Sequence, residues 1–185
     1  HTADAARPDF VKKIVDPINA LKGDLLPVSA FNGREDGTWD NGTAAYEKRG
    51  IAVNVPEWKI GNCIQCNQCA YVCPHAVIRP FLATEEEAAA SGVEWKQGLG
   101  ETKEYKFRIQ ISPMDCTGCS NCVDVCPAKD KALVMRPLEE QMPQQKNWDY
   151  ITKNIGYKQV VDKTKSVKNL QFAQPLFEFS GACAG

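Results

Sequence analysis

The sequence predicts an α+β fold in which two similar cysteine-bearing repeats form one core, with a long arm on each side of it. Three observations predict this fold. The chain has 185 residues, enough for one domain with extensions or for two small domains. Eight of its nine cysteines fall into two short groups that have the same internal spacing. Stretches with helix-like and strand-like patterning lie around both groups.

The overall composition excludes several classes of function. Lysines and arginines number 22 and aspartates and glutamates 23, so no basic surface for nucleic acid or anionic lipid is expected. No apolar run approaches the length of a membrane-spanning helix, about 18 residues. His1 opens a segment without the basic and apolar regions of a secretory signal, and methionine first occurs at Met114. We therefore expect a cytoplasmic chain, processed or cut from something longer, without nucleic-acid or membrane partners.

Residues 1–55 are predicted to form a loop-rich N-terminal arm. Apolar residues at helical spacing favour a helix over residues 10–21, although Pro17 interrupts the pattern. Residues 29–50 contain several Asn-Gly and Asp-Gly pairs, which are typical of turns. A short strand is expected over residues 51–55, ended by the proline that follows it.

The two groups of cysteines form an internal repeat with an offset of 53 residues, from Cys63 to Cys116. Each repeat reads C-x2-C-x2-C-x3-C followed by proline, and an apolar pair in a strand-like setting comes next. Repetition of this kind is typical of a duplicated structural unit. The repeats define a predicted domain over residues 56–136, with an insertion over residues 79–112.

The insertion and the C-terminal arm have different patterns. Thr84 followed by three glutamates predicts the start of a short helix in the insertion. Apolar and polar residues alternate over residues 105–111, which predicts a strand. Residues 137–185 are predicted to form a C-terminal arm. It is polar up to residue 169 and is expected to pack on another part of the protein rather than form its own core.

The cysteine spacing is that of the bacterial run that binds two 4Fe–4S clusters. Three thiolates on a tight loop can reach three irons of one cube, whereas the fourth cysteine binds the other cluster. Cluster I is therefore assigned to Cys63, Cys66, Cys69 and Cys126. Cluster II is assigned to Cys116, Cys119, Cys122 and Cys73. This crossed ligation would couple metal binding to folding and set the clusters on the order of 10 Å apart, close enough for electron transfer.

Structural zinc is the main alternative, but zinc prefers two C-x2-C pairs, and each repeat has three closely spaced cysteines and a fourth before proline. Backbone N–H groups in the loops can donate to the sulfurs. His75 is interpreted as an ordinary packed or solvated residue, with a proton-coupled role as the alternative. Lys129 and Lys131 are interpreted as solvated charges, with a raised potential of the nearer cluster as the alternative. Eight apolar residues are expected to shield the sulfurs from water: Ile64, Val72, Val77, Ile78, Ile111, Val123, Val125 and Leu133.

The residues around the cysteines resemble those of pyruvate:ferredoxin oxidoreductase, including its flavodoxin-linked members. The resemblance runs from about residue 25 to the end, whereas an ordinary ferredoxin would share only the cysteines. The matching segments are GTAAYEKRGIA from Gly42, VPEW from Val55, CIQCNQC from Cys63, CPHA from Cys73, IRPF from Ile78, MDCTGCSNC from Met114 and QPLFEFSGAC from Gln174.

The resemblance implies an enzyme that oxidatively decarboxylates pyruvate, or a related 2-oxoacid, on thiamine diphosphate and Mg²⁺ with coenzyme A as acetyl acceptor. Electrons would pass through three 4Fe–4S clusters to a soluble ferredoxin or flavodoxin. This chain would hold the medial and distal clusters and pack on the remaining domains of a homodimeric parent enzyme.

The resemblance also implies what the chain lacks. The family's proximal cluster uses a Cys-x-x-Cys pair that begins at the position of Cys183, and the sequence stops at Gly185, before the second cysteine. No Gly-Asp-Gly motif for the thiamine diphosphate is present. We therefore expect no catalytic residue here, and no turnover of pyruvate by the chain alone.

Two alternatives stay open. An independent two-cluster ferredoxin-type carrier would share the cysteines, although the long arms count against it. An iron–sulfur subunit of another oxidoreductase, such as a hydrogenase, would share them as well. A thiamine-binding domain encoded in frame after Gly185 would distinguish the parent enzyme from both.

Overall fold

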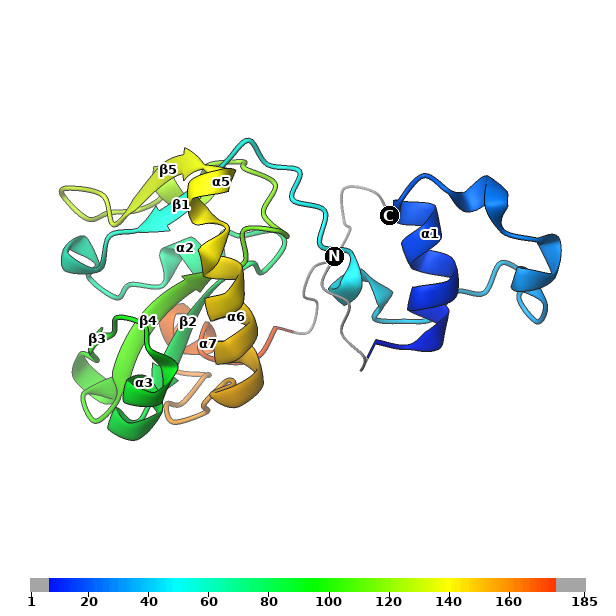
Figure 1. Ribbon diagram of the computed structural model, residues 1–185. Coiled ribbons are helices and arrows are strands. Elements are labelled where there is room, and N and C mark those ends of the chain that lie inside the picture. Colours follow the sequence, from blue (N-terminus) through cyan, green and yellow to red (C-terminus); the bar gives the residue numbers. More distant parts are fainter. Residues whose placement is uncertain (1–6, 176–185) are drawn as a thin grey trace. The chain divides into compact units, whose positions relative to one another are not determined.

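Residues 7–175 are described in a computed structural model, whose internal contacts divide the chain into two units (Figure 1). The N-terminal unit ends at Lys48 and the main unit begins at Arg49. This division precedes the predicted arm boundary at residue 55, because Ala52 and Val55 are buried in an apolar cluster of the main unit. Each unit is described here by itself.

The N-terminal unit contains one helical stretch and a series of turns. A π-helical turn, η1 (Val11–Val15), runs directly into α1 (Asp16–Asn19), so the helix expected near residues 10–21 is confirmed. Pro17 lies at the start of α1, directly after the π-helical turn, and because it has no N–H it cannot continue the helical hydrogen-bond ladder at this point. Three 3-10 turns complete the unit, as its Gly- and Asn-rich composition predicts: η2 (Gly23–Leu25), η3 (Val28–Phe31) and η4 (Thr43–Tyr46).

The main unit contains two small antiparallel sheets. In one, β1 (Asn54–Trp58) pairs with β5 (Leu133–Pro137); in the other the order is β2 (Ile78–Ala83), β4 (Lys106–Ile111), β3 (Lys96–Gln97). Strands β1 and β4 precede the two cysteine groups, and β2 and β5 follow them. Because β1 pairs with β5 and β2 with β4, the two sequence repeats are joined to each other through both sheets.

The strand expected over residues 51–55 lies three residues further along, and the prediction that proline ends it is wrong. Pro56 lies inside β1, opposite Met135 of β5. A proline is tolerated there because β1 belongs to a two-stranded sheet, in which one side of each strand needs no hydrogen-bond partner.

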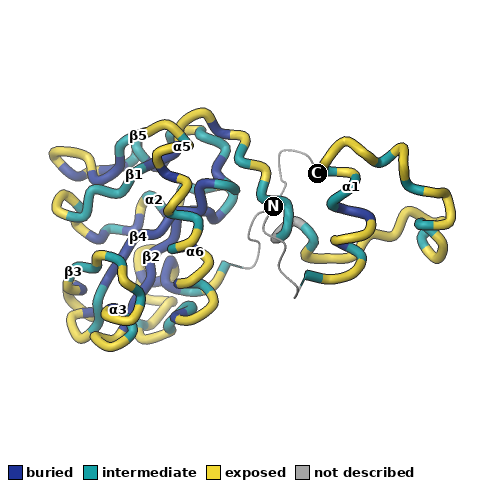
Figure 2. The backbone as a smooth tube through the Cα atoms, viewed as in Figure 1, coloured by how far each residue is buried: buried dark blue, intermediate teal, exposed yellow. Residues whose placement is uncertain are grey.

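Both faces of the β2–β4 pair are covered, and Figure 2 shows these strands as mostly buried. Leu82 and Phe107 lie opposite each other on the face that packs with the cysteines. Phe81 lies on the other face and packs against Trp148. The strand predicted from alternation over residues 105–111 is therefore confirmed, but its polar residues are buried rather than solvated: Arg108 and Gln110 hydrogen-bond with Gln144.

Short helices complete the main unit. Helices α2 (Gln68–Tyr71) and α4 (Asn121–Asp124) begin within the cysteine groups, 53 residues apart, and pack on each other. The helix expected after Thr84 is α3 (Glu85–Ser91), and Thr84 and Glu87 form a reciprocal capping box. The short turn η6 (Gly100–Thr102) follows β3.

The C-terminal arm, expected as a polar linker, is largely helical: α5 (Leu138–Gln141), α6 (Pro143–Asn154) and α7 (Val167–Leu170). As expected, it packs on another part of the chain, since Trp148 and Ile151 of α6 are buried against Phe81. The buried Arg79 of β2 also donates to the backbone oxygen of Ala173 at 2.9 Å. Across residues 7–175, no helix combines the length and apolar character needed to cross a bilayer.

Candidate iron–sulfur site

The first cysteine loop (residues 63–69) and the second cysteine loop (residues 116–122) repeat in backbone conformation as well as in sequence. Gln65 and Asn67 have φ values of 58° and 61°. Gly118 and Ser120, each 53 residues further on, have φ values of 73° and 66°. The left-handed conformation is unfavourable for residues other than glycine. Its recurrence at matching positions indicates that both loops are wound to bring their thiols to one side.

The first loop lines a small apolar cavity that is partly open to solvent. Four thiols line it, from Cys63, Cys66, Cys69 and Cys126. The cysteine from the second repeat thus lies with three from the first. The N–H of Gln65 donates to the Cys63 sulfur at 3.4 Å, and the N–H of Ala132 donates to the Cys126 sulfur at 3.3 Å.

The second loop gathers the complementary set. Cys116 and Cys73 pack together in an apolar cluster with Ala52, Val55 and Val77. Cys122 is buried, whereas Cys119 is exposed. The N–H of Gly118 donates to the Cys116 sulfur at 3.4 Å, which corresponds to the bond from Gln65 in the first loop. The N–H donors that the sequence predicted are thus present in both loops.

Burial and the proximity of other thiols make thiolate formation costly when no metal is bound. Burial raises the pKa of Cys116 to about 11, and the neighbouring Cys73 and Cys119 contribute to the increase. Burial raises the pKa of Cys122 to about 12, with contributions from Cys116, Cys73 and Cys119. The pKa of Cys69 is raised furthest, again chiefly by burial. Thiolates are the ligands of iron, so cluster binding here must release protons from these thiols.

The residues present fit an iron–sulfur cube. Within residues 7–175, no group of three or more His, Cys, Asp or Glu side chains is arranged to hold a single metal ion. The four thiols at the first loop surround a cavity instead. Trp58 also lines this cavity, and its buried indole N–H has no hydrogen-bond partner among the described residues. Soft thiolate ligands and apolar walls suit a cluster whose sulfides can accept hydrogen bonds.

The predicted apolar shield is correct in part. Val77, Ile78, Ile111 and Leu133 are buried. Ile64 is 53% exposed, so the expectation that it shields sulfur from water is wrong for most of its surface. Of the cavity-lining residues that were missed from the sequence, Trp58 and Ile109 have the largest apolar side chains. Both lie on strands next to the repeats, and strand alternation toward the core was the available signal.

Hydrogen bonds join the first loop to distant parts of the chain. The buried side chain of Gln65 donates to the backbone oxygen of Gln97 at 2.7 Å and accepts from the N–H of Leu99 at 3.0 Å. The side chain of Asn67 donates to the backbone oxygen of Lys168 at 3.1 Å. The insertion and the C-terminal arm therefore cover the first loop, which no local sequence pattern indicated.

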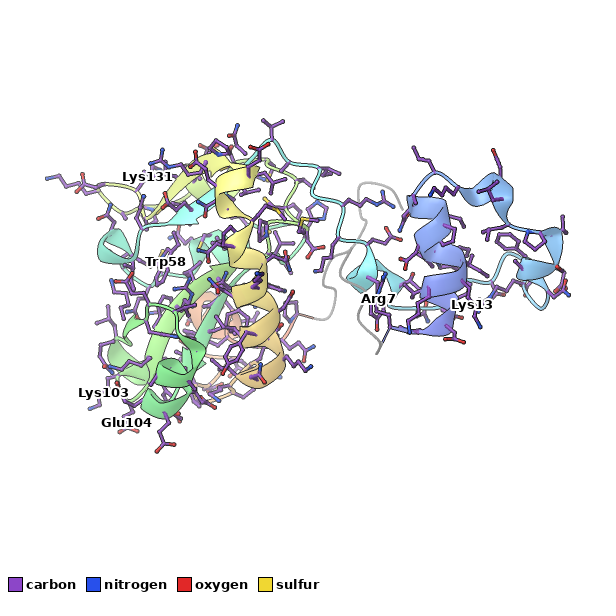
Figure 3. All side chains as sticks on the ribbon, viewed as in Figure 1. Arg7, Lys13, Trp58, Lys103, Glu104 and Lys131 are labelled. Carbon is purple, nitrogen blue, oxygen red and sulfur yellow. The ribbon has the colours of Figure 1, made fainter. Side chains whose placement is uncertain are left out.

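Lys131 is exposed, in agreement with its interpretation as a solvated charge, but it is also hydrogen-bonded to the backbone. Its ammonium group donates to the backbone oxygens of Val123, Asp124 and Cys126 at 2.8–3.0 Å. Figure 3 labels Lys131, which lies just before β5. Lys129 is exposed and makes no hydrogen bond or ion pair within the described chain, as expected.

His75 and Cys183 were also singled out from the sequence. His75 is half-buried, two residues beyond Cys73, and its interpretation as an ordinary residue stays a prediction. Cys183 lies outside the described residues.

The comparisons with known proteins agree on the nature of the site. A family model described as a 4Fe-4S dicluster domain matches residues 62–129, and one described as a domain of unknown function, EKR, matches residues 1–52. The pyruvate-flavodoxin oxidoreductase of Klebsiella pneumoniae is 53% identical over 185 residues, 99% of this chain and 16% of that protein. The pyruvate:ferredoxin oxidoreductase of Moorella thermoacetica is 54% identical over 182 residues, 96% of this chain and 15% of that protein.

Over nearly its whole length the chain is similar to one segment of these pyruvate:ferredoxin and pyruvate-flavodoxin oxidoreductases. The pyruvate dehydrogenase [NADP(+)] of Cryptosporidium parvum is also similar, at 48% identity over 181 residues, 95% of this chain and 9% of that protein. The chain spans 15–16% of the length of the first three bacterial relatives. The chain binds two 4Fe–4S clusters and functions in electron transfer, so the two predicted clusters and the α+β fold are confirmed.

Proposed function

We propose that the eight cysteines bind the clusters by crossed ligation. In this proposal Cys126 completes the set of the first loop and Cys73 completes the set of the second. The observation that carries it is the common cavity at the first loop, which Cys126 lines together with Cys63, Cys66 and Cys69. The packing of Cys73 beside Cys116 supports the second set.

We propose further that the two cluster sites act as successive stations for single electrons. A 4Fe–4S cluster, when bound, stores one electron at a time at a low potential. Cys122 from the second set and Cys63 and Cys69 from the first pack in one apolar core. This shared core supports a short path between the sites. The N–H donors to the sulfurs and the apolar walls would stabilise the bound clusters and limit the access of water.

The activity of the whole protein is part of the same proposal. The names of the bacterial relatives specify pyruvate as substrate and flavodoxin or ferredoxin as electron acceptor. The resemblance adds coenzyme A, thiamine diphosphate with Mg²⁺ and a third, proximal 4Fe–4S cluster, supplied by other domains of a cytoplasmic homodimer. In this arrangement the present chain is the medial and distal relay and contributes no catalytic residue.

Anaerobic electron paramagnetic resonance tests the relay in the full-length protein that contains this segment. Pyruvate and coenzyme A should produce the signals of both reduced clusters, and oxidised flavodoxin or ferredoxin should then remove them. The isolated chain should show the same signals with a chemical reductant but should not consume pyruvate. Pyruvate oxidation in the full-length protein without reduction of these two clusters would contradict the proposal.

A further inference from the structure

Lys131 is held against the backbone that follows the second loop. Its φ value of 37° is unusual for a residue other than glycine. The side chain donates to the backbone oxygen of Cys126 at 2.8 Å, and the next N–H, from Ala132, donates to the sulfur of Cys126 at 3.3 Å. This turn therefore directs two donors, one of them charged, at a single proposed ligand of cluster I.

Lys96 approaches the same site from another element. It lies in β3, and its ammonium group donates to the backbone oxygens of Ile60 at 2.9 Å and of Cys63 at 2.7 Å. Cys63 is a second proposed ligand of cluster I. Neither Lys96 nor Lys131 forms an ion pair within the described chain, so no carboxylate there cancels either charge.

The repeat offers cluster II no equivalent of these two lysines at the matching positions. The residue 53 positions before Lys131 is Ile78, which is buried in β2. Lys96 belongs to the insertion that follows only the first repeat. The two cluster sites therefore have matching ligands and matching loop conformations. They differ in the lysine ammonium groups, which bind the backbone of two ligands of cluster I and have no equivalent at the matching positions of cluster II.

We propose that Lys96 and Lys131 are positioning residues that raise the reduction potential of cluster I, an inference that rests on the crossed ligand sets proposed above. Reduction adds one negative charge to a cluster that four thiolates already surround. Fixed ammonium groups beside two of those ligands stabilise the added charge. Solvent screens the charge of the exposed Lys131 more than that of the half-buried Lys96. The lysines thus favour the transfer of one electron from cluster II to cluster I, with no proton moved.

The test is a redox titration followed by electron paramagnetic resonance on the reconstituted full chain and three glutamine variants. Lys131→Gln and Lys96→Gln should each lower the midpoint potential of cluster I. We expect about a threefold change in the reduction equilibrium, or about 28 mV at 59 mV per tenfold change for one electron. Lys129→Gln removes an exposed lysine two residues from Lys131 and should leave both potentials unchanged. Lys131→Arg keeps the charge and should stay close to the unmodified chain.

Each outcome can be interpreted because iron and sulfide are counted in every sample, and the cluster I signals are assigned with Cys66→Ala. An unchanged cluster I potential in Lys96→Gln and Lys131→Gln, with both clusters retained, would overturn the proposal. An equal shift in Lys129→Gln would also overturn it, since net charge alone would then explain the effect. If Lys131→Gln loses its cluster, Lys96→Gln still decides. If Cys126→Ala fails to remove the cluster that Cys66→Ala removes, the ligand assignment fails instead.

Discussion

The two cysteine loops share a spacing and a backbone path, yet they differ in what covers them. In the first loop, Gln65 and Asn67 are 1% and 2% exposed and bind the insertion and the C-terminal arm. In the second loop, Gly118 and Ser120 hold the matching positions without being fully buried, and Cys119 is exposed. A duplicated ligand motif thus preserves the chemistry of metal binding, while its surroundings diverge to give two different sites.

The close packing around Gly118 explains why the second loop has glycine at this position. A Cβ atom at Gly118 would lie 2.9 Å from the backbone oxygen of Asn54 and 3.2 Å from the Cβ of Ala52. The second loop therefore lies directly against the segment before β1. The first loop has room for a side chain at the matching position, where Gln65 forms hydrogen bonds to the insertion.

The largest expected effect comes from removing the fourth cysteine of either repeat. Cys126→Ala should remove the cluster at the first loop, and Cys73→Ala should remove the one at the second. Each variant should lose about four of eight iron atoms. Iron and sulfide analysis with paramagnetic resonance measures this, and Cys183→Ala serves as the control that keeps both clusters. If each variant loses the cluster of its own repeat, the crossed assignment is wrong.

A substitution at Gly118 should weaken only the second site. Gly118→Ala combines an unfavourable positive φ with a close approach to the backbone, at a cost of about 1–3 kcal/mol. The rate at which an anaerobic chelator removes iron should rise for cluster II and stay constant for cluster I. Gly100→Ala is the matched control, because it has a positive φ of 63° but open space around the added Cβ. Equal effects of the two variants would show that the close approach is unimportant.

Removal of the Gln65 side chain should weaken the first site in the same assay. Gln65→Ala removes the hydrogen bond from the N–H of Leu99 and the one to the backbone oxygen of Gln97, and a typical hydrogen bond contributes about 0.5–1.5 kcal/mol. The chelator should then remove iron faster from cluster I than from cluster II. Gln68→Ala deletes an exposed amide three residues away and should behave like the unmodified chain. Faster loss from cluster II would contradict the idea that the insertion protects the first loop.

The smallest expected effect is at the outer contact between the insertion and the C-terminal arm, Glu87 with Lys158 at 2.8 Å. Burial acts to raise the pKa of Glu87, but hydrogen bonds from Lys158 and from the N–H of Thr84 outweigh it, so the pKa is lowered. The Glu87–Lys158 pair therefore contributes to the free energy of unfolding above the unfolded-state pKa of Glu87. This contribution is lost as the pH falls through the lower folded-state pKa.

Glu87→Gln should accordingly destabilise α3 by less than about 1 kcal/mol near neutral pH, because the pair is partly exposed. Amide hydrogen exchange of α3 measures the effect, and the difference from the unmodified chain should shrink as the pH falls below 4.5, the ordinary value for glutamate. Glu86→Gln, at an exposed neighbour, should show no such difference. A difference that grows on acidification would contradict the assigned direction of the pKa.

The sequence alone was sufficient for the features that depend on local chemistry. The cysteine spacing identified two cluster sites, because three ligands to one cube must come from one tight loop. Thr84 with Glu87 marked the start of α3, because the capping box is formed within four residues. The alternation in residues 105–111 identified β4, and the offset of 53 residues anticipated the matching helices α2 and α4.

Only the tertiary structure decided how the two sites differ. The bond between Gln65 and Gln97 joins residues 32 apart, and the bond between Asn67 and Lys168 joins residues 101 apart. Lys131, in contrast, bonds to carbonyls five to eight residues away, yet a turn with an unusual φ value is needed to bring it there. In a sequence, polar residues such as these resemble solvated ones. The residue type does not show whether its side chain will form hydrogen bonds with water or with the backbone. For Gln65 and Asn67 burial supplies that distinction, and burial depends on which distant segments the fold brings together.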